Sequence, residues 1–193
     1  MVIIAIEGPN GAGKTWLCDS LREKLDNVKF LKTPFYKDAL GECVKKALSG
    51  HPEFLPYKDE LMYGNWLAGC RELNNDVYII DRWYDTAILY SGSSEWGKKQ
   101  DWSFIPKPSM TVVLLPPLDV VLERLDSREE QRIYDTEEGY RMVQNYYTDL
   151  GLDLNKSNKL QYVEERDFIV LNCEEHVKDF LEKISKYLSE VVM

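Results

Sequence analysis

The sequence predicts a three-layer α/β fold in which a five-stranded parallel sheet is flanked by helices. Two observations lead to this prediction. First, short continuous apolar runs alternate with longer segments whose apolar residues recur at helical spacing, and continuous apolar runs are typical of strands buried on both faces. Second, the first apolar run leads directly into a glycine-rich loop and an amphipathic segment, the order found in phosphate-loop proteins.

The expected strands are the apolar runs, in chain order. They cover Val2–Ile6, Val28–Leu31, Val77–Ile80, Thr111–Leu115 and Phe168–Leu171. Helices are expected at about 14–25, 37–49, 58–73, 118–126, 136–150 and 175–190. Because no repeat, low-complexity tract or flexible linker interrupts the chain, we expect one domain over residues 1–193. Ligands of parallel sheets bind beyond the carboxyl ends of the strands, so functional residues are expected there.

The loop after the first strand matches the phosphate-binding pattern G-x-x-x-x-G-K-[ST]. Its residues are Gly8, Pro9, Asn10, Gly11, Ala12, Gly13, Lys14 and Thr15. Glycines let the backbone bend so that successive N–H groups face phosphate oxygens, and the following helix N-terminus adds positive potential. Lys14 is expected to reach the terminal phosphates, and the Thr15 hydroxyl to ligate Mg²⁺. The loop therefore predicts a nucleoside triphosphate site, with ATP and Mg²⁺ as cofactors.

An acidic and a basic residue stand side by side at the end of the third strand. Asp81 is placed to hold a magnesium-bound water, as the second acidic element of phosphate-loop enzymes does. Arg82 offers a planar fork to a phosphate near the same strand end. A surface ion pair is the structural alternative, but the position one strand-and-helix module after the phosphate loop favours the functional interpretation.

The polar segment 127–136 lies between two expected helices and contains Arg128 and Arg132. A charged run of this kind is usually a solvated connector. Beside a nucleotide site, however, a short arginine-bearing segment is suited to act as a lid over the transferred phosphate. We therefore predict that this segment is a lid and that both arginines take part in catalysis with Lys14, Asp81 and Arg82.

Taken in order, these residues resemble the thymidylate kinases, a family of the nucleoside monophosphate kinase-like group. The resemblance covers roughly residues 2–150. It is carried by Glu7-Gly8 before the loop, Pro34 after the second strand, Asp81-Arg82-Trp83 with Thr86 and Tyr90, Pro106-Lys107-Pro108 before the fourth strand, and Arg128 with Arg132. It implies a phosphate-loop kinase fold with a short lid, acting on a deoxynucleoside monophosphate.

The resemblance also implies roles on the acceptor side of the site. Tyr63 falls where a family aromatic stacks on the acceptor base, Arg82 on the arginine that binds the acceptor phosphate, and Tyr90 on the aromatic beside the sugar. For both tyrosines the alternative is a place in the core. The full set of substrate-binding candidates is Asn10, Lys37, Tyr63, Arg71, Arg82, Thr86, Tyr90 and Tyr134.

Several positions depart from the family pattern. Asn10 stands where the family usually has Asp, so the loop carries no charge there to hold a neighbouring arginine. Leu67 stands at the base-reading arginine, and Arg71, one helical turn further on, is the candidate replacement. Tyr36 and Lys37 stand where another arginine is expected. From these differences we expect looser base selectivity than the family norm.

Composition limits the partners. The net charge of −9 argues against a protein that grips long nucleic acid over its whole surface, although a local basic pocket for a phosphate ester stays open. No run reaches the length of a membrane span, and the apolar N-terminal stretch is too short for a signal peptide, so we expect a cytoplasmic protein with small nucleotide substrates. Many large apolar residues at 58–73 and 83–92 suggest a homodimer.

Three functions compete at this stage. The leading one is ATP-dependent phosphorylation of a deoxynucleoside monophosphate, most simply dTMP to dTDP. The second is a kinase for a hydroxyl of a deoxynucleoside or modified nucleotide, which needs a carboxylate as base; Glu7 or Asp81 is the candidate. The third is a nucleotide-binding switch, which would leave the lid and acceptor residues without a role. Glu7 itself is either an acid of the site or a brace for the loop.

Overall fold

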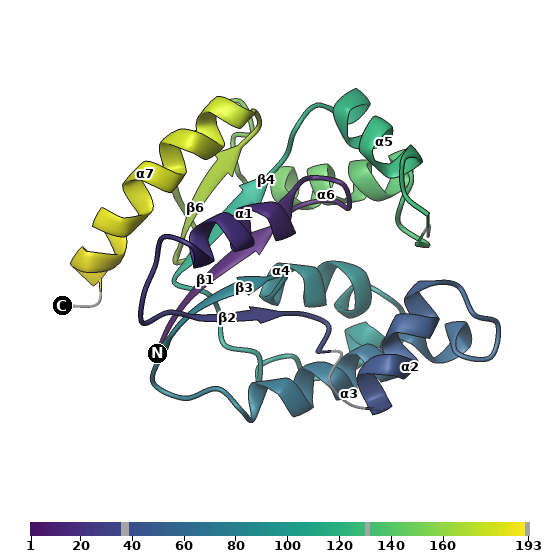
Figure 1. The fold of residues 1–193 in the computed structure, drawn as a ribbon. Helices are drawn as coiled ribbons and strands as arrows, with labels where there is room; N and C mark the ends of the chain where they lie inside the picture. Colours follow the sequence, from purple (N-terminus) through teal and green to yellow (C-terminus); the bar gives the residue numbers. More distant parts are fainter. Residues whose placement is uncertain (36–38, 130–131, 192–193) are drawn as a thin grey trace.

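The computed structural model describes residues 1–35, 39–129 and 132–191 (Figure 1). Within them the chain forms a six-stranded sheet with the order β2-β3-β1-β4-β6-β5. The strands are β1 (Val2–Glu7), β2 (Lys29–Lys32), β3 (Val77–Asp81), β4 (Met110–Leu114), β5 (Leu160–Val163) and β6 (Arg166–Leu171). Five of them run parallel and correspond to the five predicted strands, with bounds shifted by one or two residues.

The sixth strand corrects the predicted strand count. β5 lies at the sheet edge and pairs antiparallel with β6 through a hairpin. The turn residues Glu164 and Glu165 both have positive φ, 47° and 62°. Such turns are usually signalled by Asn-Gly or Asp-Gly, and two glutamates give no such signal. The prediction of five strands was therefore wrong by one edge strand, while the α/β class and the parallel arrangement are confirmed.

Helices follow the strands in the predicted alternation. The α-helices are α1 (Lys14–Arg22), α2 (Ala39–Leu48), α3 (Lys58–Cys70), α4 (Tyr84–Ala87), α5 (Leu118–Asp126), α6 (Glu137–Asp149) and α7 (Glu174–Val191). Short helical turns lie at η1 (Leu55–Tyr57), η2 (Ile88–Gly92) and η3 (Gly97–Lys99). The apolar segment 83–92, which is not among the expected helices, contains α4 and the π-helical turn η2.

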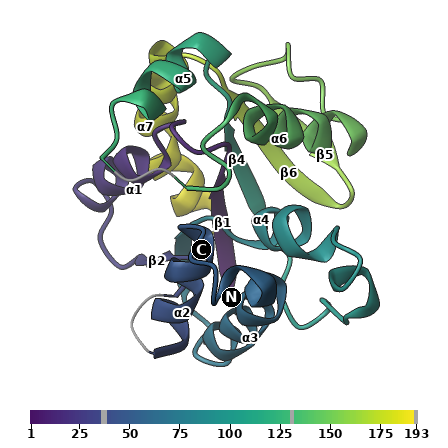
Figure 2. The same cartoon turned by 90° about the vertical axis from the view of Figure 1, so that its right-hand side faces the viewer.

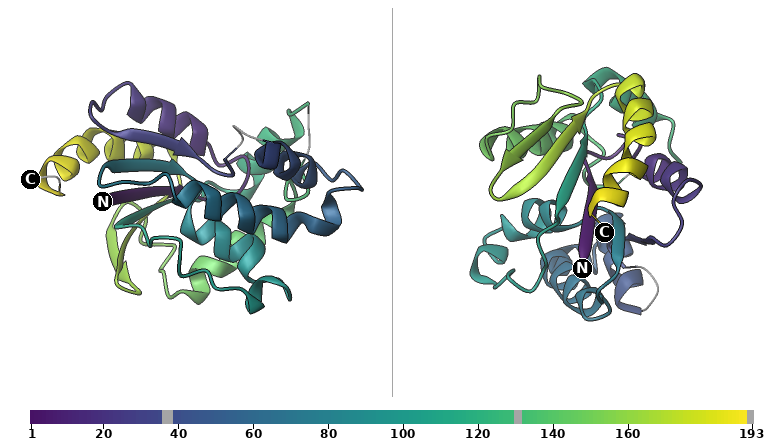
Figure 3. Two further views of the ribbon diagram at one scale, coloured as in Figure 1. Left: turned by 90° about the horizontal axis from the view of Figure 1, so that it is seen from below. Right: turned by 90° about the vertical axis from the view of Figure 1, so that its left-hand side faces the viewer.

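Side chains of β1 alternate between the two helical layers. Ile4 and Ile6 pack in the core with Leu17 of α1 and Phe180 of α7, whereas Ile3 packs with residues of α2, α3 and α4 on the opposite face. Figure 3 shows α1 and α7 together on one side of the sheet and the other helices largely across it. A third cluster, with Phe168 at its centre, packs α6 and α5 against β4 and β6.

The apolar residues that suggested a homodimer are largely taken up by this packing. Met62 and Trp66 of α3 and Ala87 of α4 are buried within the chain, as are Leu89 and Tyr90 of η2. The exposed large apolar side chains of the described residues lie elsewhere, at Met1, Trp16, Leu55, Tyr57, Leu160 and Tyr162. The large apolar residues that suggested a dimer interface therefore belong largely to the core of this chain.

None of the helices in the described ranges combines the length and apolar character needed to cross a bilayer.

Candidate active site

A cavity of about 600 Å³ opens where the parallel strands end, in the region that faces the viewer in Figure 2. Predicted residues from four segments line it. They are Asn10, Gly11, Gly13, Lys14 and Thr15 of the loop, Asp81 at the end of β3 with Arg82 after it, Thr86 of α4 and Tyr90 of η2, and Arg128, Arg132 and Tyr134 of the lid segment. The sheet topology thus gathers into one cavity residues that lie far apart in the sequence.

Two further loop residues face the protein rather than the cavity. Gly8 has φ +137°, and a Cβ there would lie 2.2 Å from the carbonyl oxygen of Leu114. Any side chain at residue 8 would push the loop away from β4, so glycine is required. Ala12 is 3% exposed and packs in the core beneath the loop. Both residues shape the phosphate loop through their packing, and they are not among the residues that line the cavity.

Lys14 lies folded back over the loop. Its Nζ donates to the carbonyl oxygens of Gly8, at 3.0 Å, and Pro9, at 2.5 Å. Burial, followed by the positive charge of Arg82, holds the pKa of Lys14 well below its usual value. A phosphate anion beside this ammonium would offset both effects, because its negative charge favours the protonated lysine.

Thr15 and Asp81 meet as the predicted metal ligands. The Thr15 hydroxyl donates to Asp81 Oδ2 at 2.9 Å, and the ammonium of Lys32, at the end of β2, lies 2.8 Å from Thr15 Oγ1 and 3.2 Å from Asp81 Oδ2. Burial alone would raise the pKa of Asp81, but the charges of Lys14, Lys32 and Arg82 keep it below its usual value. Asp81 Oδ1 is buried with no hydrogen-bond partner in the described part of the chain.

This arrangement suits Mg²⁺. The two candidate ligands are oxygens, which hard divalent cations prefer, and one carboxylate oxygen still lacks a partner. The Lys32 ammonium already occupies the neighbourhood as a cation between the two ligands. Thr15 and Asp81 are therefore the residues that would hold the ion.

Arg82 adopts a left-handed backbone conformation, with φ 69°, which non-glycine residues rarely adopt. This conformation turns its guanidinium back beneath the loop, where Nη1 donates to the Gly8 carbonyl at 3.3 Å and Nη2 donates to Asn10 Oδ1. The guanidinium carbon also lies 5.8 Å from the centre of the Tyr90 ring. The neutral Asn10 thus still accepts a hydrogen bond from the arginine, although the loop carries no charge at that position.

Two tyrosines form the wall opposite the loop. The rings of Tyr90 and Tyr134 lie 4.5 Å apart between centres, and Lys58 Nζ donates to the Tyr90 carbonyl at 2.9 Å and to the Tyr134 hydroxyl at 2.7 Å. Lys58 therefore ties the lid segment to η2. Burial is the main cause of the raised pKa of Tyr90, so its phenol stays protonated and neutral in the physiological range.

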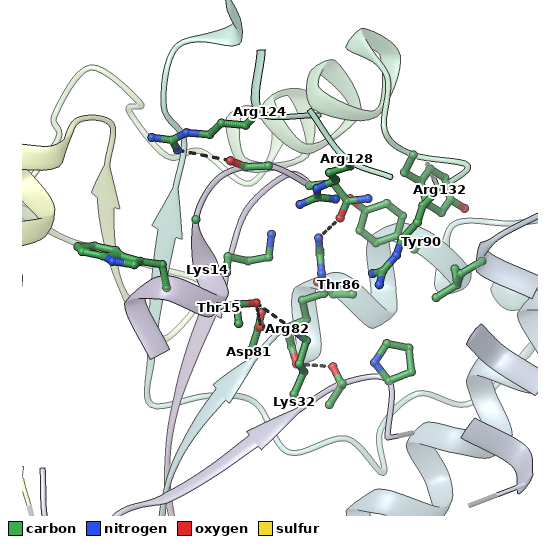
Figure 4. Close-up of a pocket in the computed structure, with 18 of the residues that line it drawn as sticks. Lys14, Thr15, Lys32, Asp81, Arg82, Thr86, Tyr90, Arg124, Arg128 and Arg132 are labelled. Atoms are coloured by element: carbon green, nitrogen blue, oxygen red, sulfur yellow. Dashed lines mark hydrogen bonds and ion pairs between the residues drawn. The ribbon is translucent and has the colours of Figure 1, made fainter. Parts of the chain in front are cut away.

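The described residues of the segment 127–136 lie over the loop, as a lid would. Arg128 Nη1 lies 3.4 Å from Asp135 Oδ2, and Arg124, one turn earlier on α5, donates to the Gly11 carbonyl at 3.4 Å. Figure 4 shows the side chains of Lys14, Arg128 and Arg132 gathered around the same space. These arginines place several positive charges around the position where a transferred phosphate would lie.

Glu7 is a brace. One carboxylate oxygen accepts from the backbone N–H groups of Trp83, at 2.7 Å, and Thr86, at 3.2 Å; the other accepts from the Thr86 hydroxyl at 2.5 Å. Burial, then the charge of Asp85, raise the pKa of Glu7 to about 7. Both oxygens are thus occupied in fixing the start of α4, which leaves Asp81 as the one carboxylate of the predicted pair that lines the cavity.

Comparison with known proteins agrees with this geometry. The family model for thymidylate kinase matches residues 6–184. This chain belongs to the thymidylate kinase family. It is 26% identical to probable thymidylate kinase 1 of Saccharolobus solfataricus, with 97% of each chain covered, and 28% identical to a probable thymidylate kinase of Metallosphaera sedula, over 79% of this chain and 84% of the relative.

A solved structure supports the fold separately. Thymidylate kinase from Candida albicans superposes with a TM-score of 0.69 at 18% identity, covering 98% of this chain and 91% of that one. Membership of the thymidylate kinase family makes the chain a nucleoside monophosphate kinase and confirms the family resemblance inferred from its motifs.

Two predicted substrate-binding residues, Tyr63 and Arg71, are not among the residues that line the cavity. Tyr63 packs its ring edge-on against Trp96, Trp102 and Phe104, and its hydroxyl donates to the Asp101 carbonyl at 3.0 Å. The expected base-stacking role of Tyr63 is therefore not supported, and its alternative as a packed aromatic fits instead.

The second of these residues is Arg71. It caps the C-terminal end of α3 and is exposed, away from the cavity-lining residues. A role for Arg71 in base readout is likewise not supported, because Arg71 is not among the residues that line the cavity. The third expected residue, Lys37, lies outside the described residues.

Other lining residues were not predicted. Leu48 of α2 and Met62 of α3 form an apolar side of the cavity, while Lys32, Trp16 and Arg124 lie around the loop. Lys32 carried a usable signal, because it directly follows a predicted strand at the ligand-binding edge of the sheet. Leu48 and Met62 carried none, since apolar residues on amphipathic helices read as core.

Proposed function

We propose that this chain transfers the terminal phosphate of ATP to the phosphate of a pyrimidine deoxynucleoside monophosphate, most simply dTMP, in one domain closed by the segment 127–136. The observation that carries the proposal is the convergence of Lys14 and Arg82 on one cavity. Lys14 belongs to the phosphate loop, and Arg82, which follows β3, donates to the same Gly8 carbonyl oxygen as Lys14. Two phosphates bound to these residues would meet end to end.

On the donor side, the loop amides and Lys14 would bind the β- and γ-phosphates. The Lys14 ammonium is held by the Gly8 and Pro9 carbonyls until an anion arrives. Thr15 and Asp81 would hold the magnesium ion of the nucleotide complex. When bound, Mg²⁺ neutralises charge on the phosphate oxygens. Trp16 is 57% exposed beside the loop, where the rest of the donor nucleotide would extend.

On the acceptor side, Arg82 would hold the acceptor phosphate. Such a phosphate is ionised near neutral pH, so the reaction needs positioning and charge neutralisation rather than a strong base. Arg128 and Arg132 would stabilise the charge that develops on the transferred group. The apolar side chains of Leu48 and Met62 and the ring of Tyr90 are the surfaces left for the base and sugar.

A hydroxyl-directed kinase is the second candidate, and the site geometry counts against it. Such an enzyme needs a free carboxylate near the acceptor hydroxyl. Both oxygens of Glu7 are taken by Trp83 and Thr86. Asp81 Oδ2 accepts from Thr15 and is paired with Lys32, and Oδ1, which has no partner among the described residues, is buried. A nucleotide switch is weaker still, because it would leave Arg82 and the lid arginines without a task.

The testing experiment is a screen for ATP consumption with nucleoside monophosphates and free nucleosides, at saturating Mg²⁺. We expect turnover with dTMP and dUMP-like acceptors that differ by less than about a hundredfold in kcat/KM, since the cavity offers them mainly apolar surface. Activity confined to a free nucleoside would reject the proposal in favour of a hydroxyl kinase. Lys14→Ala protein purified in parallel identifies any contaminating kinase.

Two further proposals concern the cellular location and the oligomeric state of the enzyme. We infer that the enzyme acts in the cytoplasm on soluble nucleotides, consistent with the lack of a membrane-crossing helix in the described ranges. We also retain a homodimer as an expectation drawn from the family resemblance alone. Light scattering at micromolar concentration would measure the oligomeric state, and a monomeric mass would reject the homodimer.

A further inference from the structure

One acidic residue of the lid, Asp135, contacts both Arg128 and the phosphate loop. Asp135 lies just before Thr136, the N-cap of α6, and its side chain is 1% exposed. It accepts from three donors: Asn10 Nδ2 at 2.6 Å, the Arg132 backbone N–H at 3.1 Å and Arg128 Nη1 at 3.4 Å. A carboxylate is rarely buried this deeply in a surface segment unless its partners require it.

The contact with Asn10 fixes which way that amide points. An amide group has a donor side and an acceptor side, an ionised carboxylate only accepts, and a guanidinium only donates. Because Asn10 lies between Asp135 and Arg82, its NH₂ must face the carboxylate and its oxygen must face the guanidinium. Arg82 and Asp135 thus favour the same orientation of the amide from its two sides, and without Asp135 the NH₂ would lose its acceptor and the amide would be held by Arg82 alone.

The same contact supplies charge. The phosphate loop is neutral at residue 10, while Arg82 and Arg128 both bring positive charge to this side of the cavity. The carboxylate of Asp135 pairs with Arg128 directly and reaches Arg82 through the Asn10 amide. In a site screened from water such a charge is worth more than on the surface.

We propose that Asp135 is a positioning residue for phosphoryl transfer, which orients Arg82 through the Asn10 amide and supplies from the lid the negative charge that the loop lacks. The proposal rests on the proposed function, because Arg82 is taken to hold the acceptor phosphate. It also makes the arrangement of Arg82 depend on the lid: the guanidinium is correctly held only when residue 135 lies against the loop.

The first test replaces the carboxylate by its isosteric amide. Asp135→Asn should lower kcat/KM for the acceptor about tenfold, as expected for loss of one charge-assisted contact. The KM for ATP should change less than about twofold, because the donor contacts do not involve residue 135. Asp126→Asn, which alters an exposed acidic residue at the end of α5, is the matched control. A loss confined to the KM for ATP would overturn the proposal.

The second test asks whether Asp135 acts through Arg82. In an Arg82→Lys background the bidentate geometry is already lost, so Asp135→Asn should cost less than about twofold there. If Asp135 only held the lid in place, Asp135→Asn would lower kcat/KM by the same factor in the parent and in the Arg82→Lys background. An equal loss would therefore reject the positioning role.

The third test moves the acid from the lid to the loop. Asn10→Asp alone sets two carboxylates at hydrogen-bond distance, and we expect about a tenfold loss. Adding Asp135→Asn restores one acid and one amide with their places exchanged, and activity should return to within about threefold of the parent. A double variant no better than the singles would overturn the proposal, and it decides the question even if Asp135→Asn alone fails to fold.

Thermal melting of each variant separates lost folding from lost chemistry. If the parent phosphorylates no nucleoside monophosphate, the proposed function fails. If the parent is active and the residue-10 and residue-135 variants match it, the positioning role alone fails.

Discussion

The donor half and the acceptor half of the cavity are built in different ways. The donor half is one continuous stretch, Gly8 to Thr15, completed by Asp81 from the adjacent strand. The acceptor half takes Leu48 from α2, Met62 from α3 and Tyr90 from η2, elements that meet only in the folded protein. A local motif carries its own geometry, whereas an assembled surface depends on how each helix is rotated about its axis. Mutations should separate the two halves accordingly.

The largest effect is expected in the donor half. Lys14→Ala should lower kcat by at least about a hundredfold, because it removes the charge nearest the donor phosphates. Steady-state kinetics would measure the loss, and circular dichroism would check the fold. Lys24→Ala, an exposed lysine beyond the end of α1, is the control. Turnover within tenfold of the parent would show that the loop is not the donor site. The division of the cavity into a donor half and an acceptor half would then be wrong.

The lid arginines should come next, because they serve the group passing between the halves. Replacing Arg128 or Arg132 by Ala is expected to lower kcat about ten- to a hundredfold with little change in either KM. Arg141→Ala, an exposed arginine on α6, provides the matched loss of charge. If both single variants and the double variant keep the parental kcat, the segment is only a solvated connector.

Glu7 joins the two halves, since it ends β1 and holds the start of α4. Burial raises its folded-state pKa to about 7, so between about pH 4.5 and 7 the folded protein keeps a proton that the unfolded chain has released. The stability of the parent should therefore fall as pH rises through this window.

Glu7→Gln should remove this decrease of stability with pH. As the pH rises from about 5 to about 8, the free energy of unfolding of the variant should increase relative to that of the parent by on the order of 1–3 kcal/mol. Urea unfolding at the two pH values measures the difference. A relative stability that does not change with pH would mean that Glu7 keeps an ordinary pKa in the fold.

The smallest effects should sharpen the description of the acceptor half. Met62→Ala should raise the acceptor KM roughly five- to tenfold by removing apolar contact area. Tyr63→Leu and Arg71→Ala should leave the KM and the preference among bases within about twofold. Kinetics with dTMP and dUMP would measure both. An Arg71→Ala variant that lost all base preference would return Arg71 to the site and show that the cavity rearranges when the acceptor binds.

The successes and failures of sequence reasoning follow the same division. Continuous apolar strands and the phosphate loop were predictable, because burial and glycine geometry mark them locally. The difference between Met62 and Tyr63 was not, since neighbouring residues on a helix point about 100° apart. Asp135 was hidden in a charged run that reads as solvated until the lid is seen against the loop. The β5 hairpin escaped because its turn has no glycine or asparagine.

The ammonium of Lys32 bears on the state of the Thr15–Asp81 pair between turnovers. It lies beside Thr15 Oγ1 and Asp81 Oδ2, so the carboxylate has a counter-ion built into the chain. The ligand pair should therefore stay assembled when magnesium is scarce, because no bare charge is left to push it apart. A magnesium ion held by Thr15 and Asp81 would replace this counter-ion, and the Lys32 ammonium would then be free to contact phosphate oxygens.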